Sequence, residues 1–463
     1  MALGKSNWLG DIQCFEGGPA RPRTEEELIA ILKDRALYPS PVRPLGSRHS
    51  MTACMAAKRS GNWGTAVDMT AFTTLRDGTP LKVDRVKRTA TIPAGRTFIE
   101  VARELRDQYN LTFNVITELG TLTIGAGACG ATKDSSSTGA KASGQVCSDV
   151  IGMRLIRPDG VACEFKRGVD PEFDALCCSY GLFGVVTEVT FQLVPHADVS
   201  LRHEQISLDE FEDRTRELLA GGYALFLYLF PYDEPPRIIA EVRCNAATDR
   251  RSGAFWLRMR NFFWVCALHY AVRLVRRLPQ SFGKLLHFGL RMFLVRCLYV
   301  KGVSPVDQIV DFRHSSPKFT FSMWAFPKEP AQGKPRFAEI LREYFEFCRR
   351  TKHNGGFHSL LPHVSYHIAG DKSSLLSYSY DGDVWTIDPI ASGDEPGWKD
   401  FLDEFNKRCS AWGGKPLFNQ TPRLNRNLVV RAFGTRLANF EAVRGAFDPD
   451  ERMLNDYFAS LLR

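Results

Sequence analysis

In residues 1–195, segments whose apolar residues have the spacing of a β-strand alternate with segments whose apolar residues have the spacing of an α-helix. Runs rich in β-branched residues, bounded by Pro and Gly, predict strands at Pro41–Leu45, Thr65–Met69, Val83–Val86, Thr89–Ile92, Val150–Ile156 and Val185–Leu193. Two other runs have helical spacing. Thr24–Leu32 opens with a capping pattern, and Thr97–Tyr109 places its apolar residues on one face. The mixture predicts an α+β fold with many short strands.

The second half of the chain continues this mixture. Strands are predicted at Lys318–Ala325, Ser377–Tyr380 and Val384–Ile387, and helices at Lys334–Arg350 and Gly397–Cys409. We place a domain boundary near Pro195, which separates a first domain, residues 1–195, from a second one, residues 196–440.

The positive charge is concentrated in one segment. The chain has 463 residues, 44% of them hydrophobic, and a net charge of +8. Residues 250–301 contain eleven Lys and Arg and no Asp or Glu, so the rest of the chain is slightly acidic. This distribution argues against a general nucleic-acid-binding surface.

Within residues 250–301 the cations interleave with Trp, Phe and Leu. This pattern favours a peripheral membrane contact over a pair of core helices with a basic solvated face, and both over a nucleic-acid site. The first residues do not have the pattern of a signal peptide, and the twelve cysteines are scattered. We therefore expect an intracellular protein that is not secreted and that contacts a membrane.

Gly125–Gly130 matches the G-x-G-x-x-G dinucleotide fingerprint, with Asp149 about twenty residues on. The following segment, Ala131–Gln145, has no helical periodicity, whereas a Rossmann fold needs a helix there. We therefore expect a glycine-rich loop whose backbone N–H groups meet a pyrophosphate. An NAD enzyme is the weakest alternative.

The glycine-rich motif is one of six short segments that follow one another in a characteristic order. They are Arg43–Ser50, Val67–Thr70, Ala90–Gly95, Leu119–Gly127, Ile151–Gly160 and Gly181–Thr190. In order and spacing they resemble the PCMH-type FAD-binding domain of the vanillyl-alcohol-oxidase superfamily, closest to its aldonolactone and alditol oxidases. A weaker resemblance at Phe447–Tyr457 implies that residues 441–463 return to this domain.

The resemblance implies a set of FAD-binding residues. They are Pro44, Leu45, Gly46, Ser47, Arg48, His49, Ser50, Thr123, Gly125, Ala126, Gly127, Gly181, Gly184 and Val186. His49 occupies the position of the histidine bonded covalently to the flavin. Arg48 stands where that motif has glycine, and Lys133-Asp134 replaces a His-Gly pair.

The second domain resembles a substrate cap, but the polar residues of the family's sugar site are changed. The aligned positions carry Met323, Leu417 and Gln420, which predicts a more apolar pocket. We expect an FAD-linked oxidase or dehydrogenase that oxidises an alcohol of a relatively apolar small molecule and passes electrons to oxygen or another carrier. The alternatives are a sugar oxidase with altered ligands and a flavin-carrying protein without catalysis.

Five residues are candidates for the chemistry of the substrate site: His358, His363, Tyr378, Lys415 and Gln420. A histidine, or Tyr378 or Tyr380, would take the hydroxyl proton. We expect no metal site, because His363 and His367 lie four residues apart on a predicted strand, about 13 Å from each other.

Overall fold

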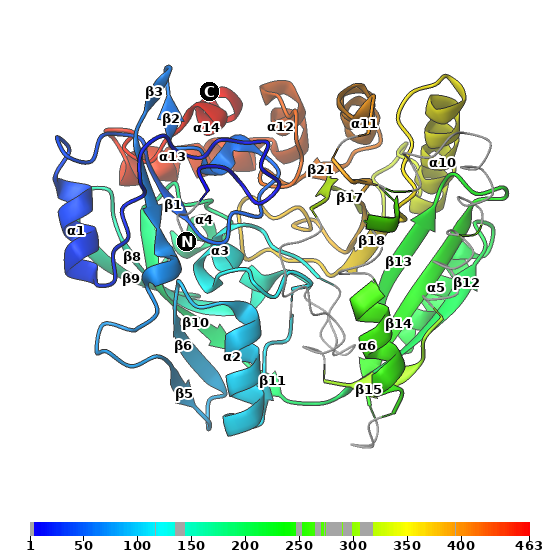
Figure 1. Cartoon of the computed structure of the whole chain (residues 1–463), viewed down its shortest axis with the longest axis horizontal. Helices are drawn as coiled ribbons and strands as arrows, with labels where there is room; N and C mark the ends of the chain where they lie inside the picture. Colours follow the sequence, from blue (N-terminus) through cyan, green and yellow to red (C-terminus); the bar gives the residue numbers. More distant parts are fainter. Residues whose placement is uncertain are drawn as a thin grey trace.

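The computed structural model describes residues 4–115, 117–134, 144–246, 252–263, 270–272, 274, 289, 299–305, 318–393 and 395–463. It has the α+β fold expected from the sequence, with two parts side by side (Figure 1). The N-terminal part is built on a five-stranded sheet in the order β5-β6-β10-β8-β9, and the second part on an eight-stranded antiparallel sheet.

The described residues of the N-terminal part form four α-helices, several short helical turns, a five-stranded sheet and several two-stranded sheets. The helices are α1 (Glu25–Lys33), α2 (Phe98–Glu104), α3 (Ile124–Cys129) and α4 (Phe173–Leu176). The five-stranded sheet comprises β5 (Lys82–Asp84), β6 (Thr89–Pro93), β8 (Val150–Ile156), β9 (Ala162–Lys166) and β10 (Val185–Gln192). The parallel pair is β1 (Val42–Leu45) and β4 (Thr65–Asp68). The short pairs are β2 (Lys58–Arg59) with β3 (Asn62–Trp63), and β7 (Leu111–Thr112) with β11 (Val194–Pro195).

The strands and helices predicted for this part are confirmed to within a few residues. Thr24 caps α1 by accepting a hydrogen bond from the Glu27 N–H, as its capping pattern predicts. The predicted helix from Thr97 continues past α2 as a π-helical turn, Leu105–Tyr109, and ends at Asn110 with a φ of 54°.

The eight-stranded sheet has the order β15-β12-β14-β13-β18-β19-β17-β21. Its strands are β12 (Val199–Ile206), β13 (Ala224–Phe230), β14 (Arg237–Asn245), β15 (Gly302–Ser304), β17 (Trp324–Pro327), β18 (His363–Ile368), β19 (Val384–Ile387) and β21 (Lys415–Pro416). A separate pair joins β16 (Thr320–Phe321) and β20 (Ile390–Ala391). The helices of this part are α5 (Phe211–Ala220), α6 (Ala254–Phe262), α10 (Phe337–His353) and α11 (Trp398–Ala411).

The two faces of this sheet have different neighbours, because successive residues of a strand point to opposite sides. Leu225, Leu227 and Leu229 of β13 pack in one apolar core with residues of α5, α10 and α11. The intervening residues Phe226 and Tyr228 face the N-terminal part. The same alternation continues on β14 and β18, so one face is core and the other is available for a site.

Two strand predictions in this part need correction. Ser377–Tyr380 forms turns, because the Ser377 side chain accepts a hydrogen bond from the Ser379 N–H and competes with strand pairing. Lys318–Ala325 divides into β16 and β17, which belong to different sheets.

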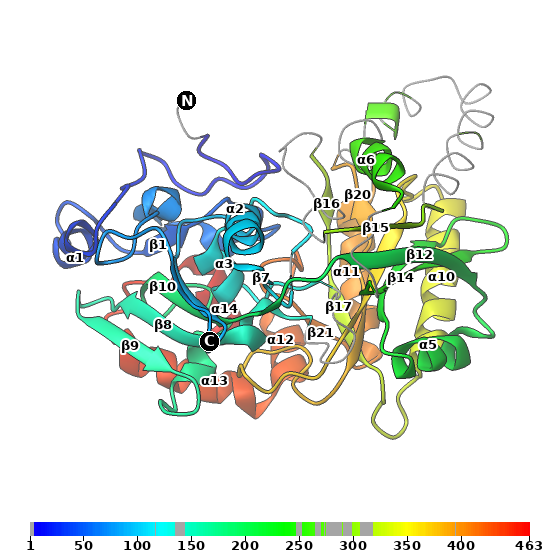
Figure 2. The ribbon, with the colours of Figure 1, turned by 90° about the horizontal axis from the view of Figure 1, so that it is seen from below.

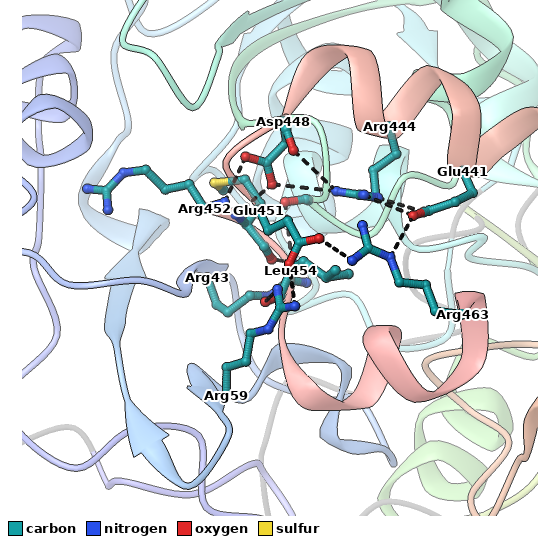
Figure 3. A network of polar contacts seen from close by, with 11 residues as sticks. Arg43, Arg59, Glu441, Arg444, Asp448, Glu451, Arg452, Leu454 and Arg463 are labelled. Carbon is teal, nitrogen blue, oxygen red and sulfur yellow. Dashed lines mark hydrogen bonds and ion pairs between the residues drawn. The ribbon is translucent and has the colours of Figure 1, made fainter.

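The C-terminal helices α12 (Arg426–Phe433), α13 (Thr435–Phe447) and α14 (Asp456–Leu462) return to the N-terminal part (Figures 1 and 2). Several arginines bind these C-terminal helices to the N-terminal part through a network of polar contacts (Figure 3). Arg452 donates to the carbonyls of Leu32, Ile31 and Tyr38, each at 2.9–3.0 Å.

Candidate active site

A cavity of about 280 Å³ lies between the two parts of the molecule. The N-terminal part contributes the loop after β1, helix α3 and the turn between α4 and β10. All the predicted FAD-binding residues line this cavity except Ser47 and Gly127. The Ser47 hydroxyl instead donates to the carbonyl of Thr121.

The loop after β1 presents His49 to the cavity. Nε2 of His49 lies 3.1 Å from the Thr121 hydroxyl, and Nδ1 is buried without a hydrogen-bond partner among the described residues. Burial lowers the pKa of His49 to about 4, and the neighbouring Arg48 cation contributes. The imidazole is therefore neutral at physiological pH, and its Nδ1 makes no hydrogen bond with the described residues.

Arg48 has an unusual backbone conformation for a residue other than glycine. Its φ is 60°, in the left-handed region that favours glycine. Its side chain donates to the carbonyl of Ser6 at 3.2 Å and to that of Gly4, which ties the N-terminal segment to the loop. Arginine is thus accommodated at a position where glycine would be unstrained.

Two glycine assignments change with the structure. Residues 124–129 form the six-residue helix α3, whereas the sequence predicted a glycine-rich loop at this position. A Cβ on Gly127 would lie 2.4 Å from a ring carbon of Phe98, so this glycine makes room for the core and not for a ligand. A Cβ on Gly46 would lie 2.2 Å from the Thr123 hydroxyl oxygen. The absence of a side chain at Gly46 therefore lets the loop after β1 pack closely against the start of α3.

Arg43 holds three segments together beneath the cavity. Its guanidinium donates to the carbonyls of Met453 at 2.8 Å, Cys54 at 2.9 Å and Tyr180 at 2.5 Å. Nε of Arg43 is buried without a hydrogen-bond partner in the described part of the chain. Burial lowers the pKa of Arg43 to about 10, so the side chain is still a cation at neutral pH.

Charged residues from both parts of the molecule line the cavity, and we call them the charged wall. Glu118 and Lys133 come from the N-terminal part, and Arg243, Arg260 and Asp388 come from the second part. A charged residue inside an apolar strand, as in Glu241-Val-Arg243 of β14, was the signal that could have indicated this wall.

Glu241 links the two arginines of this wall and is itself fully buried. One carboxylate oxygen lies 2.6 Å from Nε of Arg243, and the other lies 2.7 Å from Arg260 and 3.0 Å from His203. Nη1 of Arg243 and Nε and Nη1 of Arg260 have no hydrogen-bond partner among the described residues. The pair therefore retains donors beside the cavity for an oxygen atom of a ligand.

Lys133 and Asp134 connect the two parts of the molecule. Nζ of Lys133 lies 2.7 Å from Asp388, with side chains only 5% and 3% exposed, and 3.8 Å from the centre of the Tyr366 ring. Asp134 lies 3.5 Å from Arg243 of β14. The residues that replace the family's His-Gly pair thus bind charged groups of the opposite domain.

Of the five residues predicted for the chemistry, the structure brings only Gln420 to the cavity. His363 lies on β18, where Val364 and Tyr366 face the cavity, so alternation turns His363 toward the helices. There its Nδ1 lies 2.5 Å from the Tyr344 hydroxyl, and burial lowers its pKa to about 3.

The other three predicted residues also lie away from the cavity lining. His358 is exposed beside Tyr232, and Tyr378 is fully buried in the turn region. Lys415 pairs with Asp381. Met323 and Leu417, predicted to make the pocket apolar, are buried in the core. These residues therefore do not give the cavity an apolar lining.

Comparison with known proteins agrees with this geometry. Residues 19–166 match a family described as FAD binding domain, and residues 189–461 match the family described as D-arabinono-1,4-lactone oxidase. The chain belongs to the D-arabinono-1,4-lactone oxidase family. It is an FAD-dependent oxidoreductase of the aldonolactone oxidase or dehydrogenase type, as the sequence resemblance implied.

The named relatives of this family member are distant. L-gulono-1,4-lactone dehydrogenase of Mycobacterium tuberculosis is 22% identical over 467 residues, covering 99% of this chain and 98% of the relative. The mitochondrial L-galactono-1,4-lactone dehydrogenase of Brassica oleracea is 29% identical over 256 residues, 54% of this chain and 38% of the relative. D-arabinono-1,4-lactone oxidase of Candida albicans is 22% identical and covers 93% of this chain and 79% of the relative.

The fold is shared with cholesterol oxidase structures. That of Brevibacterium sterolicum superimposes with a TM-score of 0.75 at 14% identity, over 99% of this chain and 96% of the other. A solvent-stable cholesterol oxidase gives 0.75 at 16% identity, over 99% and 97%. Within the described residues, none of the helices is long and apolar enough to cross a membrane.

The residues present fit the FAD that the family requires. His49 Nδ1 and Arg43 Nε are buried polar atoms of cavity-lining residues with no hydrogen-bond partner in the described structure. Gly181 and Gly184 have φ values of 72° and 137° and line the same cavity with main chain. Residues of this kind hold a dinucleotide by main-chain contacts and by charge.

Proposed function

We propose that this enzyme oxidises a C–OH group of a relatively apolar, lipid-like substrate. The observation that carries the proposal is the mixed lining of the cavity. Besides the charged wall, the lining contains a set of apolar residues: Phe319, Phe321, Leu361, Pro362, Val364 and Ile390. A substrate with one hydroxyl end and an apolar body matches this lining. Its hydroxyl group can form hydrogen bonds with the charged residues, and its body can pack against the apolar residues.

Alcohol oxidation removes a hydride from the carbinol carbon and a proton from the hydroxyl. Bound FAD supplies the hydride acceptor, its N5 atom. Glu118 is our candidate for the proton acceptor, because it lines the cavity and its side chain is 28% exposed. The Tyr366 hydroxyl donates to Glu118 at 3.1 Å, and burial raises the pKa of this carboxyl group. A raised pKa makes the carboxylate a stronger base.

We include in this proposal a covalent bond between His49 and the flavin. A bond to Nδ1 needs a neutral imidazole with that nitrogen free, and His49 has both properties. The setting that we propose is intracellular, with a peripheral membrane contact through residues 250–301. Most of this segment lies outside the described residues.

A sugar-derived substrate is the second candidate. Nε and Nη1 of Arg260, which have no hydrogen-bond partner among the described residues, together with Lys133 would suit a ring with several oxygen atoms. The named relatives act on gulono-, galactono- and arabinono-1,4-lactones.

Anaerobic reduction of the bound flavin separates these candidates. We expect bleaching of the flavin absorbance by cholesterol in mixed micelles and none by L-gulono-1,4-lactone. Bleaching by the lactone alone would favour the sugar oxidase, and bleaching by neither, nor by a series of long-chain alcohols, would refute the proposed substrate class. Glu118→Gln should slow the reduction by about 10²–10⁴ and abolish the acid limb of its pH profile. Glu346→Gln on α10 is the matched control.

A further inference from the structure

Helix α6 has an unusual distribution of apolar residues. Its outer face exposes Phe255 (66%), Trp256 (64%), Met259 (47%) and Phe262 (59%). The exposed Arg258 lies among them. Because these positions follow the helical repeat, they form one continuous surface, which we call the α6 outer face. Four large apolar side chains at such exposure on one short helix mark an interaction site.

The inner face of α6 belongs to the cavity described above. Leu257 is buried against Gly302 of β15, where a Cβ would lie 2.7 Å from a Leu257 methyl carbon. Arg260 donates to Glu241 at 2.7 Å and to the Tyr228 hydroxyl at 3.0 Å. Arg260 and Asn261 both line the cavity. The same helix thus forms a wall of the site and presents apolar residues outward.

Backbone contacts fix the start of α6 to the edge of the eight-stranded sheet. The N–H of Val303 donates to the Ser252 carbonyl at 2.9 Å, and the N–H of Ser252 donates in return at 3.3 Å. Figure 2 shows α6 beside β15 at one side of the sheet. The position of the outer face is therefore set by the sheet and by the ion pair of Arg260.

The charge around α6 identifies the kind of partner. Residues 250–301 contain eleven cations and no carboxylate in the sequence, and among the described ones Arg258 on α6 and Lys301 beside β15 are exposed. A protein core would cover apolar residues without needing this charge, whereas an anionic lipid surface uses both features. Cations attract the anionic headgroups, and aromatic side chains lie at the boundary between headgroups and acyl chains.

We propose that the α6 outer face docks on an anionic lipid bilayer and so places the cavity wall formed by Arg260 at the membrane surface. This inference rests on the proposed function in one respect, since a lipid-like substrate would enter from the bilayer. The docking itself requires no turnover, so it can be tested separately from the reaction.

Flotation with vesicles tests the docking. We expect the FAD-loaded protein to bind mixed phosphatidylcholine–phosphatidylglycerol vesicles, and to bind phosphatidylcholine vesicles more weakly. Phe255→Ser/Phe262→Ser should weaken the partitioning at least about tenfold, the equivalent of about 1.4 kcal/mol. The control is Leu37→Ser/Val86→Ser, since those side chains are also exposed, at 67% and 94%, in the N-terminal part. It should bind as the unmodified protein does.

Trp256 provides a second measurement that does not depend on the variants. Brominated lipids should quench its fluorescence, and Trp256→Phe should remove most of that quenching. Absence of binding, equal binding by the Phe255/Phe262 variant, or binding without quenching of Trp256 would each overturn the proposal. Self-association of the protein that the same double substitution abolishes would also overturn it, because a second copy would then be the partner. Flavin bleaching by a micellar alcohol, with vesicle binding absent, would refute the docking and leave the proposed reaction standing.

Discussion

The ion pair between Lys133 and Asp388 is a sensitive test of how the two parts of the enzyme are held together. In a medium of effective dielectric constant about 20, two unit charges 2.7 Å apart attract by about 6 kcal/mol. Removing two ions from water costs several kcal/mol each, so the intact pair adds little net stability. Loss of one partner leaves a buried charge without compensation, which typically costs about 3–5 kcal/mol.

We therefore expect Asp388→Asn and Lys133→Met each to lower the free energy of unfolding by about 3–5 kcal/mol. The double variant Lys133→Met/Asp388→Leu should lie within about 1–2 kcal/mol of the unmodified protein, because no isolated charge remains. Urea titration followed by tryptophan fluorescence measures all three, at saturating FAD.

Asp209→Asn is the matched control, because Asp209 pairs with Arg342 at 2.9 Å but is 91% exposed. Solvent screens such a pair, so its loss should change the urea midpoint little. A loss of less than about 1 kcal/mol for Asp388→Asn would refute the reasoning. Equal destabilisation of the double variant and the summed single variants would refute it as well, since the two residues would then act independently.

Three further outcomes are expected. Acid precipitation should leave the flavin on the protein, whereas His49→Ala should release it; release from the unmodified protein would disprove the covalent bond. Gly127→Val should destabilise the protein by about 1–3 kcal/mol or prevent folding, and Phe98→Leu should recover part of the thermal midpoint, since the added side chain meets the Phe98 ring. His363 has a pKa of about 3 when folded and about 6.5 when unfolded, so stability is full above pH 6.5 and falls as the pH drops toward 3, by about 1.4 kcal/mol per pH unit. His363→Gln should flatten this slope in urea titrations; an unchanged slope would assign it to other groups.

The sequence determined the local elements and the cofactor domain. Thr24 begins a helix and Val150–Ile156 forms a strand because capping and side-chain alternation act within a few residues. The ordered glycine and histidine segments are by themselves enough to indicate an FAD-binding fold, and the loop around His49 lies in the cavity as they imply. These are properties that a short stretch of chain carries with it.

The tertiary structure decided which charges meet. Nothing near Lys133 in the sequence indicates Asp388, and the two residues come together only because the segment after α3 of the N-terminal part meets the end of β19, where Asp388 pairs with Val364 of β18. Strand alternation predicts two faces for β18 but does not say which one meets a cavity, and only the structure shows that His363 points away from the lining residues Val364 and Tyr366. The partner of a buried charge depends on strand order and register between distant segments, and a periodic pattern along one segment contains neither.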